Sequence, residues 1–411
     1  MTEEQKRIQD AGYGVIYLAA CAVNGAEPDK EWLAQANIRD LHRMSQKHDL
    51  TAIVYMALES VLAKETDFSA YTNSEADKEL LKRWEKEKAQ AVCKNLLLDA
   101  EREQILHFME QEKIWYLPLK GILLKELYPK AGMRQMVDND ILYDVSGQKK
   151  LFAFMTGRGY QASQIGKGNH DVYEKPPVYN YEMHTRLHGV YSGPIWESYY
   201  ADVKQRLIKD EGNSCGWHFS DEDFYIYLVT HVYKHYTGGG TGLRSLLDSY
   251  VYIREKGKLL NWEYIEAETT KLGILKFERQ FRRLSEKAFS VEGPYDLKSL
   301  MPEERELLDY ILLSGTYGTM ENRVKSELKE LEAAYHCTGL RPKLAYLRNR
   351  LFQDERFFKS RYPFAYRHRW ARPFVLGFRM IRGIVCRREN LRRELRILRE
   401  TWFLGKDRRH R

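Results

Sequence analysis

The stretch that decides the fold is residues 116–144, YLPLKGILLKELYPKAGMRQMVDNDILYD. It opens with a short apolar run, which predicts a strand that ends at Lys120-Gly121. Residues 122–128 predict a short helix, and Pro129 ends it because proline cannot donate a backbone hydrogen bond inside a helix. A turn that contains glycine then leads into a second strand, which begins at Asp-Asn-Asp.

Asp138 and Asp140 stand at the start of this second predicted strand. Side chains two residues apart in a strand point to the same face, so we expect both carboxylates to project together, with Asn139 and Ile141 behind them. Two carboxylates directed at one point repel each other unless a cation lies between them, and hard oxygen ligands suit Mg²⁺ or Mn²⁺. A bare Asp-x-Asp also occurs in solvated acidic turns. The upstream Lys120-Gly121 turn, whose backbone N–H groups could cradle phosphate, favours the metal site.

This arrangement resembles the nucleotidyltransferase superfamily typified by DNA polymerase beta, in which a Gly-Ser turn opens a helix and a strand carries Asp-x-Asp. It is more closely similar to an uncharacterised bacterial nucleotidyltransferase family with the pattern Leu-Lys-Gly, Tyr-Pro, Gly-x-Arg and Asp-x-Asp. The matching residues occur in the same order and are Leu119-Lys120-Gly121, Tyr128-Pro129, Gly132-Met133-Arg134 and Asp138-Asn139-Asp140. The sequence departs from the superfamily in having Lys-Gly for Gly-Ser, and Asn139 where an apolar residue is usual.

A third carboxylate is predicted further along the chain. Residues 170–174 and 178–187 predict two strands joined by a Lys-Pro-Pro turn, and the second strand contains Glu182-Met183-His184. Superfamily members carry a third acid on a neighbouring strand, and the family pattern acid-x-His matches here, so the resemblance implies that Glu182 is this acid. Nucleotidyl transfer needs charge neutralisation on the phosphates and activation of the attacking hydroxyl. From the residues alone, Glu182 is equally consistent with an exposed strand position.

A predicted helix at residues 221–236 contains two histidines, His231 and His235, on one face. Their spacing can hold zinc, although no Glu follows the first histidine as in zinc proteases. The family pattern His-x-x-Lys-His, followed by a helix with an Asp, matches His231, Lys234, His235 and Asp248. The resemblance implies that this helical pair closes over the nucleotide, with Lys234 or His235 on phosphate. Two core or capped histidines are the alternative.

The composition places the chain among globular proteins. Its 411 residues suffice for two or three domains, and 43% hydrophobic with 30% charged residues is ordinary. No run of about 18 apolar residues predicts a transmembrane helix. The N-terminal residues are polar and acidic, unlike a signal peptide, and the five cysteines are scattered without a Cys-x-x-Cys pair. These features predict reduced thiols in a cytoplasmic protein.

Positive charge is concentrated in the C-terminal tail. Residues 341–411 contain 22 Lys and Arg against 6 Asp and Glu, whereas the preceding residues contain 44 against 52. Aromatic residues lie among the arginines, a composition that can bind nucleic acid or an anionic membrane surface. The tail is also consistent with helices that pack on an acidic protein body, which is the interpretation we favour.

The sequence therefore predicts an α+β protein with a nucleotidyltransferase-like small mixed sheet flanked by helical lobes. The predicted segments are a helical lobe at 1–112, the nucleotidyltransferase core at 113–195, a helical lobe that closes the site at 196–340 and a basic helical tail at 341–411.

The predicted activity is metal-dependent transfer of a nucleoside monophosphate from an NTP, such as ATP, to an unidentified acceptor. The predicted site residues are Asp138, Asp140 and Glu182 on Mg²⁺ or Mn²⁺, and Lys120, Gly121, Arg134, His184, Lys234 and His235 on the nucleotide. A non-catalytic nucleotide sensor or partner-binding protein is the alternative, and a nucleic-acid binder acting through the tail is a third class. The intact acids favour the enzyme, and salt-dependent retention on nucleic acid would favour the third class.

Overall fold

The computed structural model describes residues 3–64, 74–189, 193–290, 296–353, 355–386 and 388–407. The chain forms two compact units, one of residues Met1–Tyr233 with Thr241–Thr316 and one of residues Lys234–Gly240 with Tyr317–Arg411. A five-stranded mixed sheet and a two-stranded sheet lie among many helices, so the predicted α+β class is confirmed.

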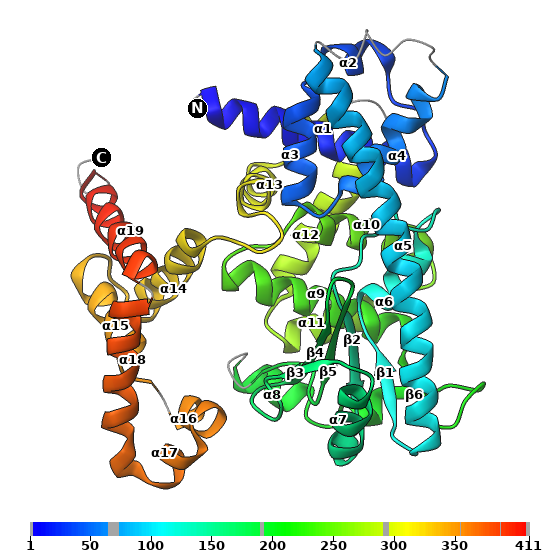
Figure 1. Ribbon diagram of the computed structural model, residues 1–411. Coiled ribbons are helices and arrows are strands. Elements are labelled where there is room, and N and C mark those ends of the chain that lie inside the picture. The colour runs from blue at the N-terminus through cyan, green and yellow to red at the C-terminus, as the bar shows by residue number, and fades with distance from the viewer. Residues whose placement is uncertain are drawn as a thin grey trace. The chain divides into compact units, whose positions relative to one another are not determined.

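The first unit begins with five helices (Figure 1). They are α1 (Glu3–Asn24), α2 (Lys30–Gln35), α3 (Ile38–Lys47), α4 (Thr51–Leu62) and α5 (Glu75–Gln111). Between α3 and α4 the chain turns at Asp49, whose φ of 53° is in the left-handed region that Asp adopts more readily than most residues. The long α5 is capped by Ser74, which accepts a hydrogen bond from the Asp77 N–H.

His48, at the end of α3, is buried in the first unit and makes stability depend on pH. Its Nδ1 accepts a hydrogen bond from the Leu243 N–H at 3.1 Å. Burial, with the nearby charge of Lys47, lowers the pKa of His48 to about 3. In the unfolded chain, His48 becomes protonated below about pH 6.5, but in the folded state it stays neutral until the pH is much lower. The contribution of His48 to the free energy of unfolding is therefore complete above about pH 6.5. It falls as the pH drops from there towards the folded-state pKa of about 3.

We expect the wild-type protein to lose about 2 kcal/mol more unfolding free energy between about pH 7 and pH 5 than the His48→Asn variant. Asn keeps an acceptor for the Leu243 N–H but does not titrate. Urea unfolding followed by tryptophan fluorescence at both pH values measures the difference. The control is His107→Asn, on the exposed face of α5, which should retain the wild-type pH dependence. Equal pH dependence in wild type and His48→Asn would contradict the assignment.

The main sheet has the strand order β1-β2-β5-β4-β3. The strands are β1 (Tyr116–Pro118), β2 (Asn139–Tyr143), β3 (Gln161–Ser163), β4 (His170–Lys175) and β5 (Tyr179–His184). The central pair, β2 and β5, is parallel, and every other pair is antiparallel. The helix α7 (Gln148–Gly157) and the β3–β4 segment lie between β2 and β5 in the chain, which gives this parallel pair the crossover that it needs.

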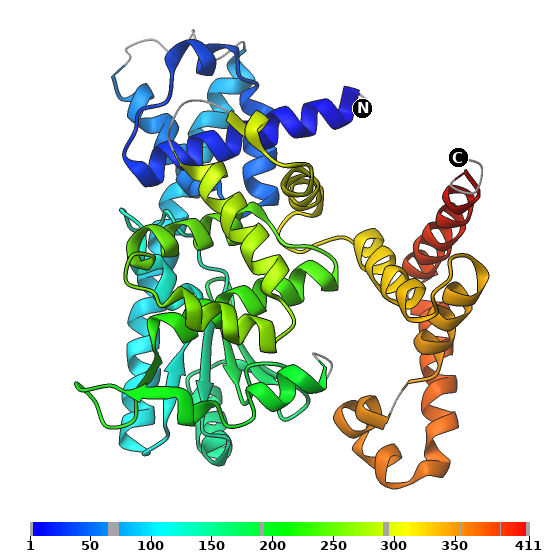
Figure 2. The same cartoon turned by 180° about the vertical axis from the view of Figure 1, so that it is seen from behind.

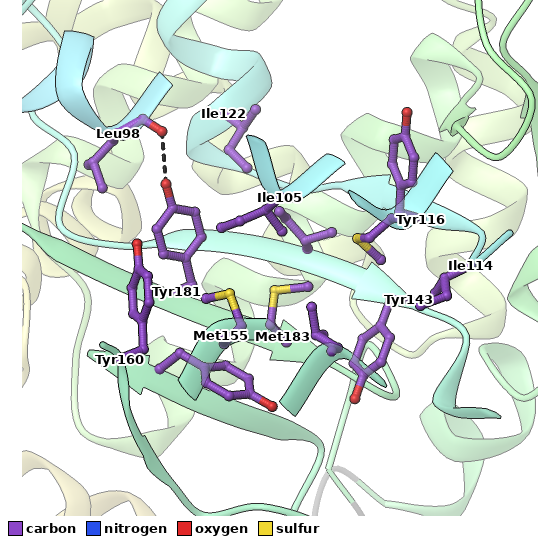
Figure 3. Close-up of a cluster of buried hydrophobic side chains, with 14 of the residues drawn as sticks. Leu98, Ile105, Ile114, Tyr116, Ile122, Tyr143, Met155, Tyr160, Tyr181 and Met183 are labelled. Atoms are coloured by element: carbon purple, nitrogen blue, oxygen red, sulfur yellow. Dashed lines mark hydrogen bonds between the residues drawn. The ribbon is translucent and has the colours of Figure 1, made fainter. Parts of the chain in front are cut away.

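One face of this sheet packs against α5 and α7 around a hydrophobic core (Figure 3). Ile141, Tyr181 and Met183 of the sheet meet Leu98, Ile105 and Met109 of α5 and Met155 of α7. The Tyr181 hydroxyl also donates to the Leu98 carbonyl at 2.9 Å. Because strand side chains alternate, the neighbours of these core residues point to the opposite face of the sheet. We call this opposite face the site face; it carries Asp140, Glu182, His184 and His170.

The segments on either side of β2 contain short helical turns, and one local prediction there is wrong. Asp144 accepts a hydrogen bond from the Ser146 N–H and caps a short 3₁₀ turn, η2 (Val145–Gly147), ahead of α7. Residues 122–128 form a single α-turn, α6 (Gly121–Leu124), followed by a 3₁₀ turn, η1 (Lys125–Leu127), instead of one helix. Pro129 still marks the end of this helical segment.

Helices also follow the sheet in the first unit, as Figure 2 shows from behind. They are α8 (Pro194–Tyr199), α9 (Asp221–Gly238), α10 (Leu243–Lys256), α11 (Trp262–Lys271), α12 (Leu275–Phe289) and α13 (Pro302–Ser314), and the end of α9 from Lys234 onward belongs to the second unit. The small sheet of β6 (Leu207–Lys209) and β7 (Trp217–Phe219), which the sequence pattern did not predict, lies between α8 and α9 in the chain. The glycine run ends α9 as expected, since Gly239 and Gly240 have φ of 137° and 135°.

The second unit is helical and includes the predicted basic tail. Its helices are α14 (Met320–Ala334), α15 (Leu340–Leu351), α16 (Glu355–Arg361), α17 (Pro363–Arg367), α18 (Arg372–Cys386) and α19 (Arg388–Asp407). Val324 and Leu328 of α14 pack with Tyr346 of α15 and Ile397 and Leu398 of α19, so the arginine-rich helices have a hydrophobic cluster of their own. Within the part of the chain that the structure describes, no helix combines the length and the apolar character needed to cross a membrane.

Candidate active site

The strand register brings the predicted acids and histidines to one place on the site face. Asp140 of β2 lies directly opposite Glu182 of the parallel strand β5, and Asp138 immediately precedes β2. His184 follows Glu182 by two residues on the same face, and β4 places His170 directly opposite His184. The predicted grouping of Glu182 with His184 therefore has a geometric basis in the sheet.

Asp140 has shorter contacts than Glu182. Its Oδ1 atom lies 3.1 Å from Lys120 Nζ and 2.7 Å from His184 Nε2. Lys120 reaches it from the turn before α6, where its φ of 44° is in the left-handed region. Glu182 Oε2 lies 3.6 Å from His184 Nε2 and 3.7 Å from His170 Nε2. Asp140, Glu182 and Lys120 thus form a connected charged cluster with two imidazoles.

Burial and mutual charge make the two aspartates electrostatically different. Burial, together with the charge of Asp140, raises the pKa of Asp138 to about 6. Burial alone would also raise the pKa of Asp140, but Lys120 and the hydrogen bond from His184 outweigh it and hold that pKa well below its ordinary value. Asp140 in turn raises the pKa of Lys120 and of His184 against the effect of burial. Asp140 is therefore ionised and paired. Asp138 is a carboxylate that, among the described residues, lacks a strong cationic partner.

The back face of the Asp-x-Asp strand is as expected, and the polar residue in it has a partner. Ile141 is fully buried in the core, and Asn139 is fully buried beside it. Arg102 of α5 donates to Asn139 Oδ1 at 3.2 Å. A polar residue is tolerated at this usually apolar position because α5 supplies a hydrogen-bond donor.

Arg134, predicted to bind the nucleotide, is engaged by a buried carboxylate. Its guanidinium makes a two-pronged contact with Asp248 of α10, at 2.8 and 2.9 Å, and the Tyr128 hydroxyl donates to the same carboxylate at 2.7 Å. Gly121 leaves room for this arrangement, because a Cβ atom there would lie 2.4 Å from Arg134 Nη1. Tyr128 and Arg134 therefore join the segment between β1 and β2 to Asp248 of α10. The nucleotide-binding role of Gly121 and Arg134 stays a prediction.

Two other cations lie near Asp138 and were not among the predicted site residues. Lys94 of α5 donates to the Val137 carbonyl at 3.1 Å, and burial lowers its pKa while Asp138 partly offsets that effect. Arg244, at the start of α10, contacts Asp49 at 3.2 Å, and its charge acts on the Asp138 carboxyl. These residues come from helices far apart in sequence, so only the fold brings them together.

A further buried group, Tyr227 of α9, faces the same cluster. Burial raises its pKa, and the charges of Lys120, Asp140 and Glu182 act on its hydroxyl. That hydroxyl is inaccessible and has no hydrogen-bond partner among the described residues. A buried polar atom without a partner is rare, and it marks a position where a ligand can supply the missing hydrogen bond.

The remaining predicted residues lie elsewhere in the fold. Lys234 and His235 are on the last turns of α9, in the second unit, and their role on phosphate stays a prediction. Asp171 of β4 points to the core side of the sheet, where Tyr143 and Gln148 donate to it at 2.9 and 2.7 Å. It is therefore a structural carboxylate and no member of the cluster.

Asp138, Asp140 and Glu182 are the residues of the predicted site that could hold a divalent cation. Asp138, Asp140 and Glu182 supply carboxylate oxygens, and Asp138 in particular is destabilised as a carboxylate by its acidic neighbour. Oxygen donors of this kind suit Mg²⁺ or Mn²⁺. The fold and this site define an α+β protein whose mixed sheet gathers three acids, two imidazoles and a lysine on one face.

Comparison with known families gives the same class. The model of a family described as uncharacterised nucleotidyltransferase matches residues 34–290, which is more than half of the chain. The chain therefore belongs to this nucleotidyltransferase family. The match spans the sheet, α9 and α10, so all of the charged cluster lies inside it. No curated protein and no solved structure matches the chain.

Proposed function

We propose that this protein is a metal-dependent enzyme of the DNA-polymerase-beta-like superfamily that transfers a nucleoside monophosphate from an NTP to an acceptor. The observation that carries the proposal is the β2–β5 register, which sets Asp140 opposite Glu182, with Asp138 beside them. The chain that holds these residues belongs to a nucleotidyltransferase family. The reaction breaks the bond between the α- and β-phosphates, joins the α-phosphate to an oxygen or nitrogen of the acceptor and releases pyrophosphate.

Each group of the cluster has a definite role in this proposal. Asp138 and Asp140 would hold Mg²⁺ or Mn²⁺, which when bound neutralises charge on the phosphates. Lys120 and His184 keep Asp140 ionised and oriented through their contacts with its Oδ1 atom. Glu182, on the neighbouring strand, is the carboxylate that lies towards the acceptor and accepts its proton.

Lys94 and Arg244 are the cations that the proposal assigns to the triphosphate. Both lie within electrostatic range of Asp138. Among the described residues, Arg244 pairs with Asp49 through one guanidinium nitrogen, Nη1, at 3.2 Å, and a guanidinium has further N–H groups that can bind phosphate. Arg134, by comparison, has its guanidinium fork occupied by Asp248.

The proposal is tested by incubating the protein with mixed NTPs and Mg²⁺ in the presence of pooled candidate acceptors. Mass spectrometry should find an acceptor whose mass has increased by one nucleoside monophosphate, and a coupled assay should detect pyrophosphate release. Tight nucleotide binding without release, across hydroxyl, phosphate and amine acceptors, would favour the alternative of a nucleotide sensor with the same fold.

A further inference from the structure

We infer that His170, Glu182 and His184 form a binding site for a transition-metal ion of the Zn²⁺ type, separate from the Mg²⁺ or Mn²⁺ site assigned to Asp138 and Asp140. Among the described residues, these three form the group whose potential ligand atoms all lie within 4.8 Å of one another. The group shares Glu182 with the predicted carboxylate set and contributes two imidazoles in place of the aspartates. The inference concerns metal binding in the absence of substrate and stands whether or not the protein transfers nucleotides. While an ion of this type is bound, Glu182 is a ligand and does not act as the base of the proposed function.

The distances within this group match ligands of a common ion better than they match hydrogen bonds. Both imidazoles direct Nε2 to the same oxygen, Glu182 Oε2, at 3.6 and 3.7 Å. A direct N–H···O hydrogen bond is shorter, at about 2.7–3.2 Å. Ligands at about 2.1 Å from a tetrahedral ion lie about 3.4 Å from one another. An ion can therefore be placed between these atoms with little rearrangement.

The backbone holds the three ligands in register without help from the ion. His170 and His184 are directly opposed on the antiparallel strands β4 and β5, with ring centroids 5.1 Å apart. Glu182 precedes His184 by two residues and therefore projects to the same face. Side chains that project from paired strands vary less in position than side chains on loops, which suits a preformed metal site.

The second nitrogen of His184 lies beside a side-chain amide. Asn169 Nδ2 is 3.5 Å from His184 Nδ1, and a half-turn of this amide would offer its oxygen to the Nδ1–H that a histidine bound to an ion through Nε2 carries. His184 Nε2 currently donates to Asp140 at 2.7 Å, and a divalent ion would take the place of that proton. Asp140 would still be paired with Lys120, at 3.1 Å.

The ligand set decides which ion is preferred. Two imidazoles with one carboxylate form the set found in zinc hydrolases and in several iron sites, with a further position left for water or substrate. Mg²⁺ binds imidazole poorly and favours oxygen ligands. The site side chains are partly accessible, since His170 and Glu182 are 23% and 26% exposed, so an ion can enter.

The test is calorimetry of Zn²⁺ binding without nucleotide, with Co²⁺ as a spectroscopic probe of coordination by nitrogen. The wild-type protein should bind one Zn²⁺ at this site and give a visible Co²⁺ absorption band. His170→Asn, which removes a partly exposed ligand and should leave the fold intact, should weaken Zn²⁺ binding by roughly 10-fold to 100-fold or more and reduce the band. Circular dichroism and the melting temperature confirm that each variant is folded.

The matched control is His218→Asn, because His218 of β7 also pairs with a carboxylate, Asp210 at 2.6 Å, but lacks a second imidazole. This control should bind Zn²⁺ as the wild type does. Equal Zn²⁺ affinity in wild type and His170→Asn, or no specific Zn²⁺ binding by the wild type, would overturn the inference. Because no NTP is present, either failure leaves the nucleotidyltransferase proposal to its own test.

Discussion

The Asp138→Asn/Asp140→Asn variant is expected to lose magnesium-dependent nucleotide binding, with an affinity for ATP or another NTP lower by roughly 100-fold or more. Both replacements keep the size of the side chain but remove the charged oxygen ligands. In the wild type the two carboxylates are close enough that the charge of Asp140 helps to raise the pKa of Asp138 to about 6, after burial. A cation bound between them relieves this repulsion, and the variant has no repulsion to relieve.

Calorimetry with NTP, with and without Mg²⁺, measures this loss directly. Asp144→Asn is the control, because Asp144 lies at the end of the same strand but only caps the η2 turn, a role that Asn also performs. The Asp140 replacement leaves Lys120 with a weaker partner, so the melting temperature of each variant must be compared first. Magnesium-dependent binding of equal strength in the double variant would show that Asp138 and Asp140 do not hold the metal.

The sequence was sufficient to predict those parts of the site that depend on local periodicity. The alternation in β2 puts Asp140 and Ile141 on opposite faces of the sheet. The alternation in β5 likewise puts Glu182 and His184 on the face opposite to that of Met183. A pattern with a period of two determines which side chains share a face once the strand is recognised. The hydrophobic stripe of α5 was predictable for the same reason.

Groups that reach the cluster through tertiary contacts were not predictable. His170 joins because the β4–β5 hairpin sets it opposite His184, and a shift of one residue would have turned it to the core. Lys94 and Tyr227 arrive from helices whose sequences contain no chemical motif at those positions. Pairing register and helix packing depend on contacts between distant residues, which a single sequence does not display.

Arg134 shows the opposite limit of motif reasoning. The family pattern predicts that Arg134 binds the nucleotide, but its partner in the structure is Asp248, which lies 114 residues further along the chain. A guanidinium binds carboxylate and phosphate with the same two-pronged geometry. The sequence therefore does not distinguish an arginine that pairs with a buried carboxylate from one that binds phosphate. Only the contact with Asp248 distinguishes an arginine that joins two elements from one that is available to a ligand.

The Glu182→Gln variant is expected to bind NTP nearly as well as the wild type while its turnover falls by roughly 100-fold or more, the usual effect of losing a general base. In the proposed function, Asp138 and Asp140 would still bind the triphosphate through the metal. Glu182 is on the neighbouring strand, and the proposal assigns it to the side from which an acceptor would approach for in-line attack. Gln keeps the shape and hydrogen bonding of Glu but cannot accept the acceptor's proton.

The two results must occur together, because a loss of NTP affinity would instead place Glu182 on the nucleotide. Single-turnover kinetics with the identified acceptor, alongside calorimetry with NTP, separate the two effects. The control is Glu174→Gln, an exposed glutamate of the adjacent strand β4, which should behave as the wild type. Wild-type turnover by Glu182→Gln would show that Glu182 is only a strand residue. Asp144 and Asp171 could not readily replace it, because the first caps the η2 turn and the second is hydrogen-bonded on the core side of the sheet.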